Sequence, residues 1–303
     1  MSPSWLILAD DLTGAADAAA AFARRGFHAE VTWGAASLSE AVSVHAVDLA
    51  SRTSDAAEAA RRHRDAVGRW SAPGRLVFKK IDSTLRGQPA AEMAAVAAGL
   101  RDAGRPSWGL LAPANPAMRR TVRDGHVFVD AAPLEASATW AREHTYPSAN
   151  LSMVAASAGL RAVTLPLAEL RGDESAVRAA FDSAATSGRT DATLLIADAE
   201  TDADLTRLVD VASSVVPGFF AAYRRFRQRA RGIRTSQSHG ATSRRRREAR
   251  WWRWYAGRVS ASGGVPSGGA RGCGRAEGAV GLVRRSCSRR AGHGGRRRAP
   301  APR

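Results

Sequence analysis

The fold is decided near the amino terminus by Trp5-Leu6-Ile7-Leu8-Ala9-Asp10-Asp11-Leu12-Thr13-Gly14-Ala15. The first five residues form a short apolar run that is typical of a buried strand. The polar turn after them leads into an alanine-rich stretch that stops at Gly26. A strand that passes through a polar turn into a helix is the repeating unit of parallel sheets. We therefore expect an α/β fold that begins at this point.

The same alternation of apolar runs and amphipathic stretches continues to about Val216. Further strands are expected at 28–33, 45–50, 75–81, 108–112, 127–129 and 192–197, and helices at 15–25, at 55–70, from 89 and from 202. This order predicts a doubly wound, mainly parallel sheet over residues 1–217. Ligands of such sheets bind beyond the carboxyl ends of the strands. Three polar loops are expected there, at 10–14, 82–87 and 113–125.

Charge divides the chain into two unlike parts. The formal net charge is +17, yet residues 218–303 alone hold 23 arginines, no lysine and two acidic residues, so residues 1–217 are mildly acidic. The apolar run at 5–9 is too short for the core of a signal peptide, and no stretch approaches the roughly 20 apolar residues of a membrane helix. Cys273 and Cys287 both lie in the basic part, which fits a reducing compartment. We expect a cytoplasmic protein without a membrane partner.

Residues 218–303 lack any sustained hydrophobic period and are dominated by arginine, glycine, alanine and serine. This composition predicts a disordered basic tail. Its abrupt start resembles a GC-rich gene read in the wrong frame, and the segment is then a frameshifted remnant. The alternative is a nucleic-acid-binding tail, with arginines on phosphates and stacking by Trp251, Trp252, Trp254 and Tyr255. No repeated short unit supports that alternative, and a polycation retains nucleic acid nonspecifically. His239 and His293 have no metal-ligand spacing with the two cysteines, so zinc is not expected, and no residue is assigned to a metal site.

The loop at 10–14 carries two adjacent carboxylates, Asp10 and Asp11. They would repel a phosphate, but they can accept hydrogen bonds from sugar hydroxyls, hold Mg²⁺, or take a proton from a hydroxyl nucleophile. The alternative is a plain helix cap by Asp11 or Thr13, with Gly14 for the turn. A cap explains one acidic residue easily and two poorly.

The second loop follows the only two lysines of the chain, Lys79 and Lys80. An ammonium is a compact charge suited to a carboxylate or phosphate. Lys80 and Arg86 can flank an anion, and between them lie groups that can address hydroxyls, namely Asp82, Ser83 and Thr84. The alternatives are a strand that ends in two solvated lysines and a turn in which Asp82 caps and pairs with Arg86. Together the two loops describe a pocket for a small polyhydroxy acid.

Three motifs now carry a resemblance to a known family. They are Ala9-Asp10-Asp11-Leu12-Thr13-Gly14-Ala15, Lys80-Ile81-Asp82-Ser83-Thr84-Leu85-Arg86-Gly87, and Ala112-Pro113-Ala114-Asn115-Pro116 followed by Arg120-Thr121-Val122-Arg123-Asp124-Gly125-His126. In this order and spacing they resemble the four-carbon acid sugar kinase family, which includes D-threonate, D-erythronate and 3-oxo-tetronate kinases. The resemblance covers about residues 4–214, so it extends to the amino-terminal domain only.

The resemblance implies an amino-terminal domain, here residues 1–217, that binds a four-carbon sugar acid. It also implies a carboxy-terminal domain that binds ATP, with Mg²⁺, through glycine-rich loops. Catalytic roles are implied for Asp10, Asp11 and Asp82, one of which would be the base for the attacking hydroxyl. Substrate-binding roles are implied for Lys80, Ser83, Thr84, Arg86, Asn115 and Arg120.

The chain departs from the family pattern in several places. Arg119 and Ala131 stand where glycine is expected, Ser137 stands where threonine is usual, and a side chain at Arg119 could crowd its loop. Within residues 218–303, the glycine pairs 263–264 and 268–269 do not lie between a strand and a helix, so no ATP site is visible. We therefore expect the frameshifted segment to stand in place of the nucleotide-binding domain. The chain would then be truncated, inactive as a kinase, and limited to substrate binding.

Overall fold

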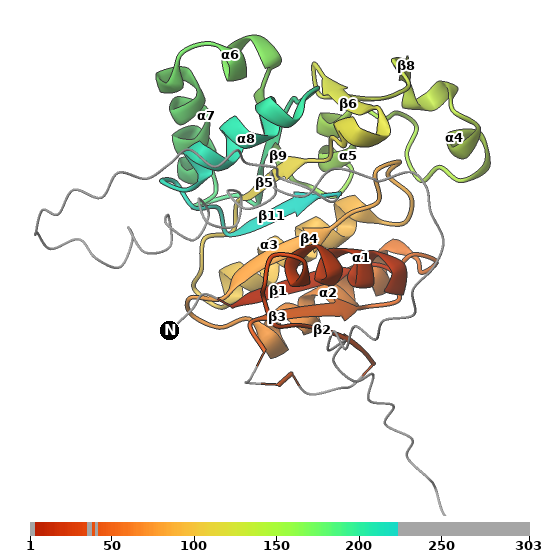
Figure 1. Ribbon diagram of the computed structural model, residues 1–303, viewed down its shortest axis with the longest axis vertical. Coiled ribbons are helices and arrows are strands. Elements are labelled where there is room, and N and C mark those ends of the chain that lie inside the picture. The colour runs from red at the N-terminus through yellow and green to blue at the C-terminus, as the bar shows by residue number, and fades with distance from the viewer. Residues whose placement is uncertain (1–3, 35–37, 40–41, 224–303) are drawn as a thin grey trace, which may run out of the picture.

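Eight parallel strands form the main sheet of the computed structural model, which describes residues 4–34, 38–39 and 42–223 (Figure 1). In sheet order these strands are β2 (Ala29–Trp33), β3 (Val44–Asp48), β1 (Trp5–Ala9), β4 (Leu76–Lys80), β11 (Phe219–Ala222), β5 (Gly109–Ala112), β10 (Thr193–Ala197) and β9 (Arg161–Leu165). Every neighbouring pair is parallel. Strand β1 is buried along its whole length, because helices cover both faces of a parallel sheet.

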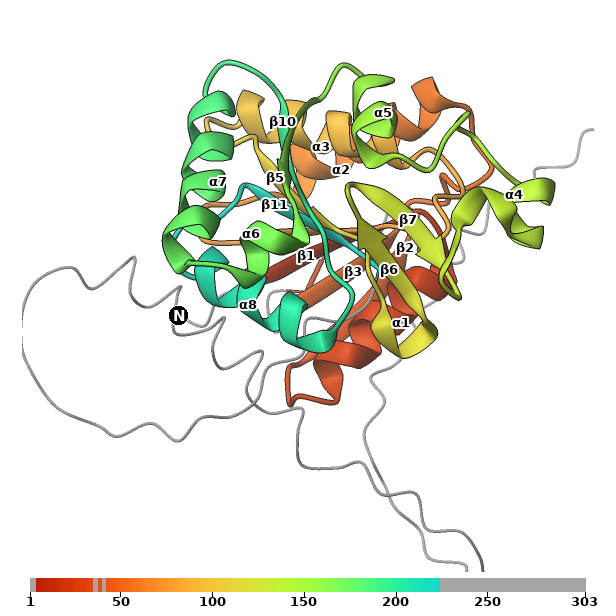
Figure 2. The same cartoon turned by 90° about the horizontal axis from the view of Figure 1, so that it is seen from above.

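Helices lie on both faces of this sheet. They are α1 (Leu12–Ala23), α2 (Ala56–Trp70), α3 (Pro89–Asp102), α4 (Ala138–Arg142), α5 (Leu151–Ala156), α6 (Leu167–Arg171), α7 (Glu174–Ser187) and α8 (Asp202–Ala212). Figure 2 shows α1 on one face and α2 with α3 on the other. Side-chain caps fix where helices begin: Asp55 accepts a hydrogen bond from the Glu58 amide at 2.8 Å, and Thr201 starts α8 with a capping box. The predicted doubly wound, mainly parallel α/β fold is confirmed.

A second sheet holds three short antiparallel strands, β6 (Arg120–Arg123), β7 (His126–Val129) and β8 (Ala132–Pro133). The expected strand at 127–129 therefore exists, but it does not belong to the parallel sheet. Arg123 pairs with His126 across a two-residue turn, Asp124-Gly125, in which both φ angles are positive. An Asp-Gly pair favours this hairpin turn, and the hairpin makes the strands antiparallel. Two short 3₁₀ turns, Pro116–Met118 and Leu134–Ala136, flank this sheet in the sequence.

Strand β11 corrects the expected domain boundary at residue 217. Phe219–Ala222 was expected in the tail, yet it lies between β4 and β5 at the centre of the sheet. Phe219 and Phe220 are buried, so this short apolar run completes the core. Gly218 precedes this strand, where the backbone passes close to Pro106. A Cβ at this position would lie 1.8 Å from the Pro106 carbonyl oxygen, so only glycine fits.

The departures from the family pattern have a structural explanation. Arg119 and Ala131 both have a positive φ, 55° and 67°, a conformation that favours glycine. The Arg119 side chain is largely exposed and pairs with Asp130 at 2.8 Å, so it does not crowd its loop. Ser137 caps α4 by accepting a hydrogen bond from the Trp140 amide at 3.1 Å, as a threonine could.

Residues 224–303 lie outside the described residues, so the expected disordered tail, the frameshift and the nucleic-acid-binding alternative all concern a segment that is not described. Across the ranges that are described, no helix has both the length and the apolar character needed to cross a bilayer.

Candidate functional site

Asp10 and Asp11 follow β1 at the carboxyl edge of the sheet, but they differ in environment. Asp11 is the N-cap of α1 and accepts a hydrogen bond from the Gly14 amide at 2.7 Å. The capping alternative therefore accounts for Asp11. Asp10 is only 1% exposed, and its Oδ1 atom has no hydrogen-bond partner among the described residues. A buried, unpaired carboxylate oxygen is costly, which points to a role other than capping.

Arg52, which sequence reasoning missed, joins the two predicted loops. Its Nε donates to Asp10 Oδ2, its Nη2 lies 3.2 Å from Asp11 Oδ2, and its Nη1 lies 3.7 Å from Asp82 Oδ2. Burial acts to raise the pKa of Asp10, but the hydrogen bond from Arg52 and the charges of Lys79, Arg52 and Lys80 hold it below its ordinary value. Asp10 is therefore ionised at neutral pH.

The loop after β4 is organised around Asp82. Its carboxylate accepts hydrogen bonds from the amide and hydroxyl of Thr84 and from Arg86, whose Nη2 lies 2.9 Å from Oδ2. Burial acts to raise the pKa of Asp82, but these bonds from Arg86 and Thr84 hold it well below its usual range. The alternative of a turn in which Asp82 caps and pairs with Arg86 therefore describes these two residues, and Thr84 is the group that Asp82 caps. It does not account for Ser83.

Lys80 is buried on the α1 face of the sheet. Its Nζ donates to the Ile81 carbonyl at 2.8 Å and lies 4.4 Å from the ring centre of Tyr223, the residue that follows β11. Burial lowers the pKa of Lys80 to about 8, so it is mostly protonated at pH 7. No carboxylate of the described part of the chain lies within ion-pair distance of it. The solvated-strand-end alternative is therefore wrong for both lysines, since Lys79 is buried as well.

Beside this cluster lies a polar cavity of about 240 Å³. Its walls come from the loop after β4, from Met118 and the first residue of β6, from α4 with the residue after it, and from Tyr223. They comprise Asp82, Ser83, Thr84, Arg86, Met118, Arg120, Thr139, Arg142, Glu143 and Tyr223. Arg120 donates to Ser83 Oγ at 2.7 Å, and its guanidinium lies 5.9 Å from the Tyr223 ring centre. It forms no ion pair with a described residue.

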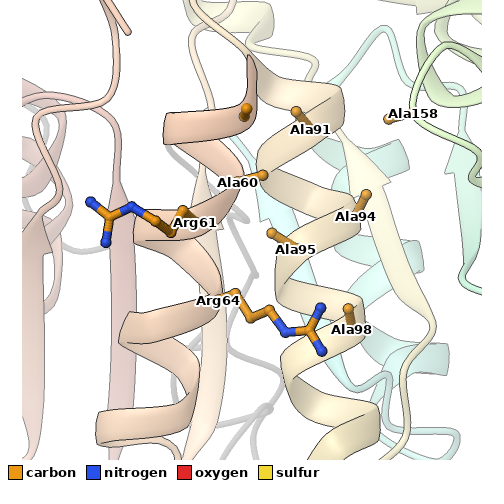
Figure 3. A pocket seen from close by; sticks show the side chains of 9 residues that line it. Ala60, Arg61, Arg64, Ala91, Ala94, Ala95, Ala98 and Ala158 are labelled. Atoms are coloured by element: carbon orange, nitrogen blue, oxygen red, sulfur yellow. The ribbon is translucent and has the colours of Figure 1, made fainter. Parts of the chain in front are cut away.

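A larger hollow of about 480 Å³ lies elsewhere, along the outer surfaces of α2 and α3. Figure 3 shows that its lining is mostly alanine, with Arg61 and Arg64 at its edge. It has no convergent set of hydrogen-bonding groups, so the polar cavity is the better candidate for a ligand site.

The described residues do not form a metal site. No group of three or more His, Cys, Asp or Glu side chains within 4–34, 38–39 and 42–223 is arranged to hold a metal ion. Asp10, Asp11 and Asp82 instead share Arg52 as their partner. Three carboxylates that surround one guanidinium do not fit Mg²⁺, which needs the same oxygens.

The sequence matches a known protein family over nearly all of its described residues. The family described as "Sugar-binding N-terminal domain" matches residues 5–222. The chain belongs to this family. The predicted resemblance to the amino-terminal domain of four-carbon acid sugar kinases is confirmed.

The relatives of this sugar-binding domain include a D-threonate kinase of Cupriavidus necator, 41% identical over 224 residues, which cover 72% of this chain and 51% of that protein. A D-threonate kinase of Bordetella bronchiseptica is 39% identical over 140 residues, 42% of this chain and 33% of that one. A crystal structure from Bordetella bronchiseptica, described as a domain of unknown function with bound citrate and as a domain-swapped dimer, is 28% identical with a TM-score of 0.60. It covers 73% of this chain and 53% of that one. The chain spans about half the length of the Cupriavidus enzyme.

Of the nine predicted site residues in the sugar-binding domain, five line the polar cavity: Asp82, Ser83, Thr84, Arg86 and Arg120. Asp10, Asp11 and Lys80 lie behind it, joined to it through Arg52 and Tyr223. Asn115 does not line the cavity; its backbone pairs with that of Arg120.

Arg52 and Tyr223, which connect the cavity-lining residues to Asp10, Asp11 and Lys80, were not predicted from the sequence. The reason differs for each of them. Arg52 follows β3 at the same carboxyl edge of the sheet, so the rule that pointed to the other loops could have found it. Tyr223 was missed because the strand before it was assigned to the tail.

Proposed function

We propose that the described residues bind a four-carbon sugar acid such as D-threonate in the polar cavity. The observation that carries the proposal is Arg120, a guanidinium in the cavity wall that has no carboxylate partner among the described residues. Lys80, on the same Tyr223 ring, is a second cation without one. An acid ligand would supply the missing negative charge.

The size and polarity of the cavity support a small hydroxylated ligand. Its volume of about 240 Å³ is below the range of about 300–1,000 Å³ that is typical of pockets for larger organic ligands. Ser83 and Thr84 add hydroxyls beside Arg120, and they can exchange hydrogen bonds with the hydroxyls of a sugar acid. The Bordetella structure contains bound citrate, which is also a small hydroxy acid.

Although Asp10 lies behind the wall of the cavity, it is the carboxylate that we propose as the partner of a hydroxyl on a substrate that reaches past this wall toward Arg52. Asp11 is used by the helix cap and Asp82 by Thr84 and Arg86, whereas Asp10 Oδ1 is unpaired among the described residues. Its lowered pKa keeps it ionised, as a hydrogen-bond acceptor or a base must be.

ATP-dependent phosphorylation is the activity that the names of the kinase relatives imply, and this chain spans about half of the Cupriavidus enzyme. We therefore propose acid binding, without phosphoryl transfer, as the function of the described residues. In a protein that contains both halves, the bound acid would present its hydroxyl to ATP. The Mg²⁺ that neutralises phosphate charge in such reactions would be held outside these residues.

Isothermal titration calorimetry of the 303-residue chain tests the proposal. We expect binding of one or more of D-threonate, D-erythronate and 3-oxo-tetronate, and none of D-threitol, which lacks the carboxylate. Arg120→Gln should weaken acid binding by roughly 10- to 100-fold, the effect of losing a hydrogen bond to a charged group. Arg123→Gln is the matched control, since Arg123 is exposed on the same strand and pairs with Glu200. Failure of all three acids to bind, or equal losses in both variants, would reject the proposal.

A further inference from the structure

Lys79 and Lys80 are adjacent on β4, so their side chains point to opposite faces of the sheet. Lys80 lies on the side of Tyr223. Lys79 is fully buried beneath α2 and α3, where its Nζ lies 2.9 Å from Glu92 Oε2. The same ammonium donates to the carbonyl oxygen of Lys80 at 2.5 Å. Lys79 therefore holds the backbone of Lys80 by a hydrogen bond, and the Lys80 ammonium faces the candidate site on the other side of the sheet.

Glu92 connects Lys79 to the loop after β3, which carries Ser51 and Arg52. It is the fourth residue of α3 and is 1% exposed. Its Oε1 accepts a hydrogen bond from Ser51 Oγ at 2.5 Å. The amides of Ser51 and Arg52 in turn donate to the carbonyl of Asp10 at 2.9 and 3.0 Å. One buried carboxylate thus connects Lys79 to the loop that carries Arg52.

His63 of α2 closes the back of this cluster. Its Nδ1 hydrogen bonds to the Ala59 carbonyl at 2.9 Å, and its Nε2 lies 4.0 Å from Glu92 Oε2. Burial lowers the pKa of His63 to about 4, so the ring is neutral at pH 7. Lys79 is then the cation that pairs with the Glu92 carboxylate. Although burial also acts to raise the pKa of Glu92, Lys79 holds it below its ordinary value.

Stability alone does not account for such a pair. Burying two charges carries a large desolvation penalty, and well-packed apolar residues of similar volume often stabilise the same space equally well. Each end of the pair, moreover, reaches a different segment of the site: Lys79 reaches the Lys80 backbone, and Glu92 reaches Ser51 beside Arg52.

We propose that Lys79 and Glu92 are positioning residues, which hold the Lys80 backbone and the Ser51–Arg52 loop in register, so that Arg52 meets Asp10 and the Lys80 ammonium lies against the Tyr223 ring. For its ligand, the inference rests on the proposed function, but its geometry can be tested without any ligand. The chain offers a direct probe, because these are its only two lysines.

The experiment uses the full chain labelled with ¹³C-lysine, which gives two side-chain ε-CH₂ signals by NMR. The double variant Lys79→Met/Glu92→Met removes both charges. Lys80 is then the one remaining lysine, so the spectrum contains its signal only. We expect its melting temperature to stay within about 4 °C of wild type. We expect the Lys80 signal to move toward the position of a solvated lysine, and the affinity for D-threonate to fall about tenfold or more.

Val177→Ala is the control for destabilisation, since Val177 is buried in α7 away from these residues. It should lower the melting temperature while the Lys80 signal and the affinity stay at wild-type values. If the double variant fails to fold, Glu92→Gln, which keeps the shape of the side chain, takes its place and should move the Lys80 signal part of the way. A folded variant whose Lys80 signal is unchanged overturns the positioning role. A wild-type chain that binds no acid rejects the proposed function instead, and the signal shift still decides the positioning role.

Discussion

Replacing Arg52 by methionine should destabilise the chain far more than the loss of a surface arginine. The Arg52 side chain is 18% exposed, and the side chains of two of its carboxylate partners, Asp10 and Asp82, are 2% and 8% exposed. Methionine keeps an unbranched side chain but leaves these buried charges without their shared partner. Removing one member of a buried ion pair costs about 3–5 kcal/mol. For a domain of this size that cost corresponds to a fall in melting temperature of roughly 6–20 °C.

Urea unfolding followed by circular dichroism measures this difference, with Arg64→Met as the control. Arg64 pairs with Asp102 at 2.7 Å, but both side chains are 57% exposed, so the pair should contribute about 0–1 kcal/mol. The pKa values of Asp10 and Asp82 are lowered in the folded chain, so the stability they confer is present above pH 3.8 and is lost as the pH falls further. The gap between wild type and Arg52→Met should therefore shrink below about pH 4. Equal free energies of unfolding for the two variants would refute the role assigned to Arg52.

Three further predictions concern single positions. Gly218→Ala places a Cβ where the Pro106 carbonyl leaves no room, so it should lower the free energy of unfolding by at least about 1–3 kcal/mol, as at a typical overpacked site. Urea unfolding measures this, and a neutral result would contradict the close approach. Ala131→Gly should stabilise by up to about 1 kcal/mol in the same assay, because the relief of a positive φ outweighs the added freedom of the unfolded chain, and a loss of stability would count against this. The affinity for D-threonate should fall as the pH rises through about 8, because burial lowers the pKa of Lys80 and its ammonium is lost there. Calorimetry of Lys80→Met should show weaker binding without that pH dependence, and an unchanged profile would exclude Lys80 from binding.

The parallel sheet could be predicted because its strands are short apolar runs separated by helices. The expected strands of the main sheet lie within two residues of the observed bounds, as at β4, Leu76–Lys80. Strand β9, Arg161–Leu165, was not predicted, since only one of its residues is buried and it lies at the edge of the sheet. Strand β11 was missed because four apolar residues beside an arginine-rich segment give no local signal. Its place between β4 and β5 depends on contacts that are distant in the sequence.

The candidate site was predictable where a single loop contains the chemistry. Four of the five residues from Asp82 to Arg86 line the cavity, and Arg120 joins them from the third motif. Residues that act across loops were harder to find, since Arg52 touches carboxylates from two other segments. Composition suggested a special role for the lysine pair, but not that the two side chains lie on opposite faces. That distinction follows from the strand, in which neighbouring residues alternate.

The central claim, that an acid binds beside Lys80 and Arg120, is tested most directly by titrating the ¹³C-lysine-labelled wild-type chain with D-threonate. The Lys80 ε-CH₂ signal should shift progressively and saturate as a single site fills, while D-threitol leaves it in place. The Lys79 signal should move less, because Lys79 is buried on the opposite face of the sheet. A Lys80 signal that stays fixed up to about 10 mM D-threonate, well beyond a millimolar dissociation constant, would contradict the account.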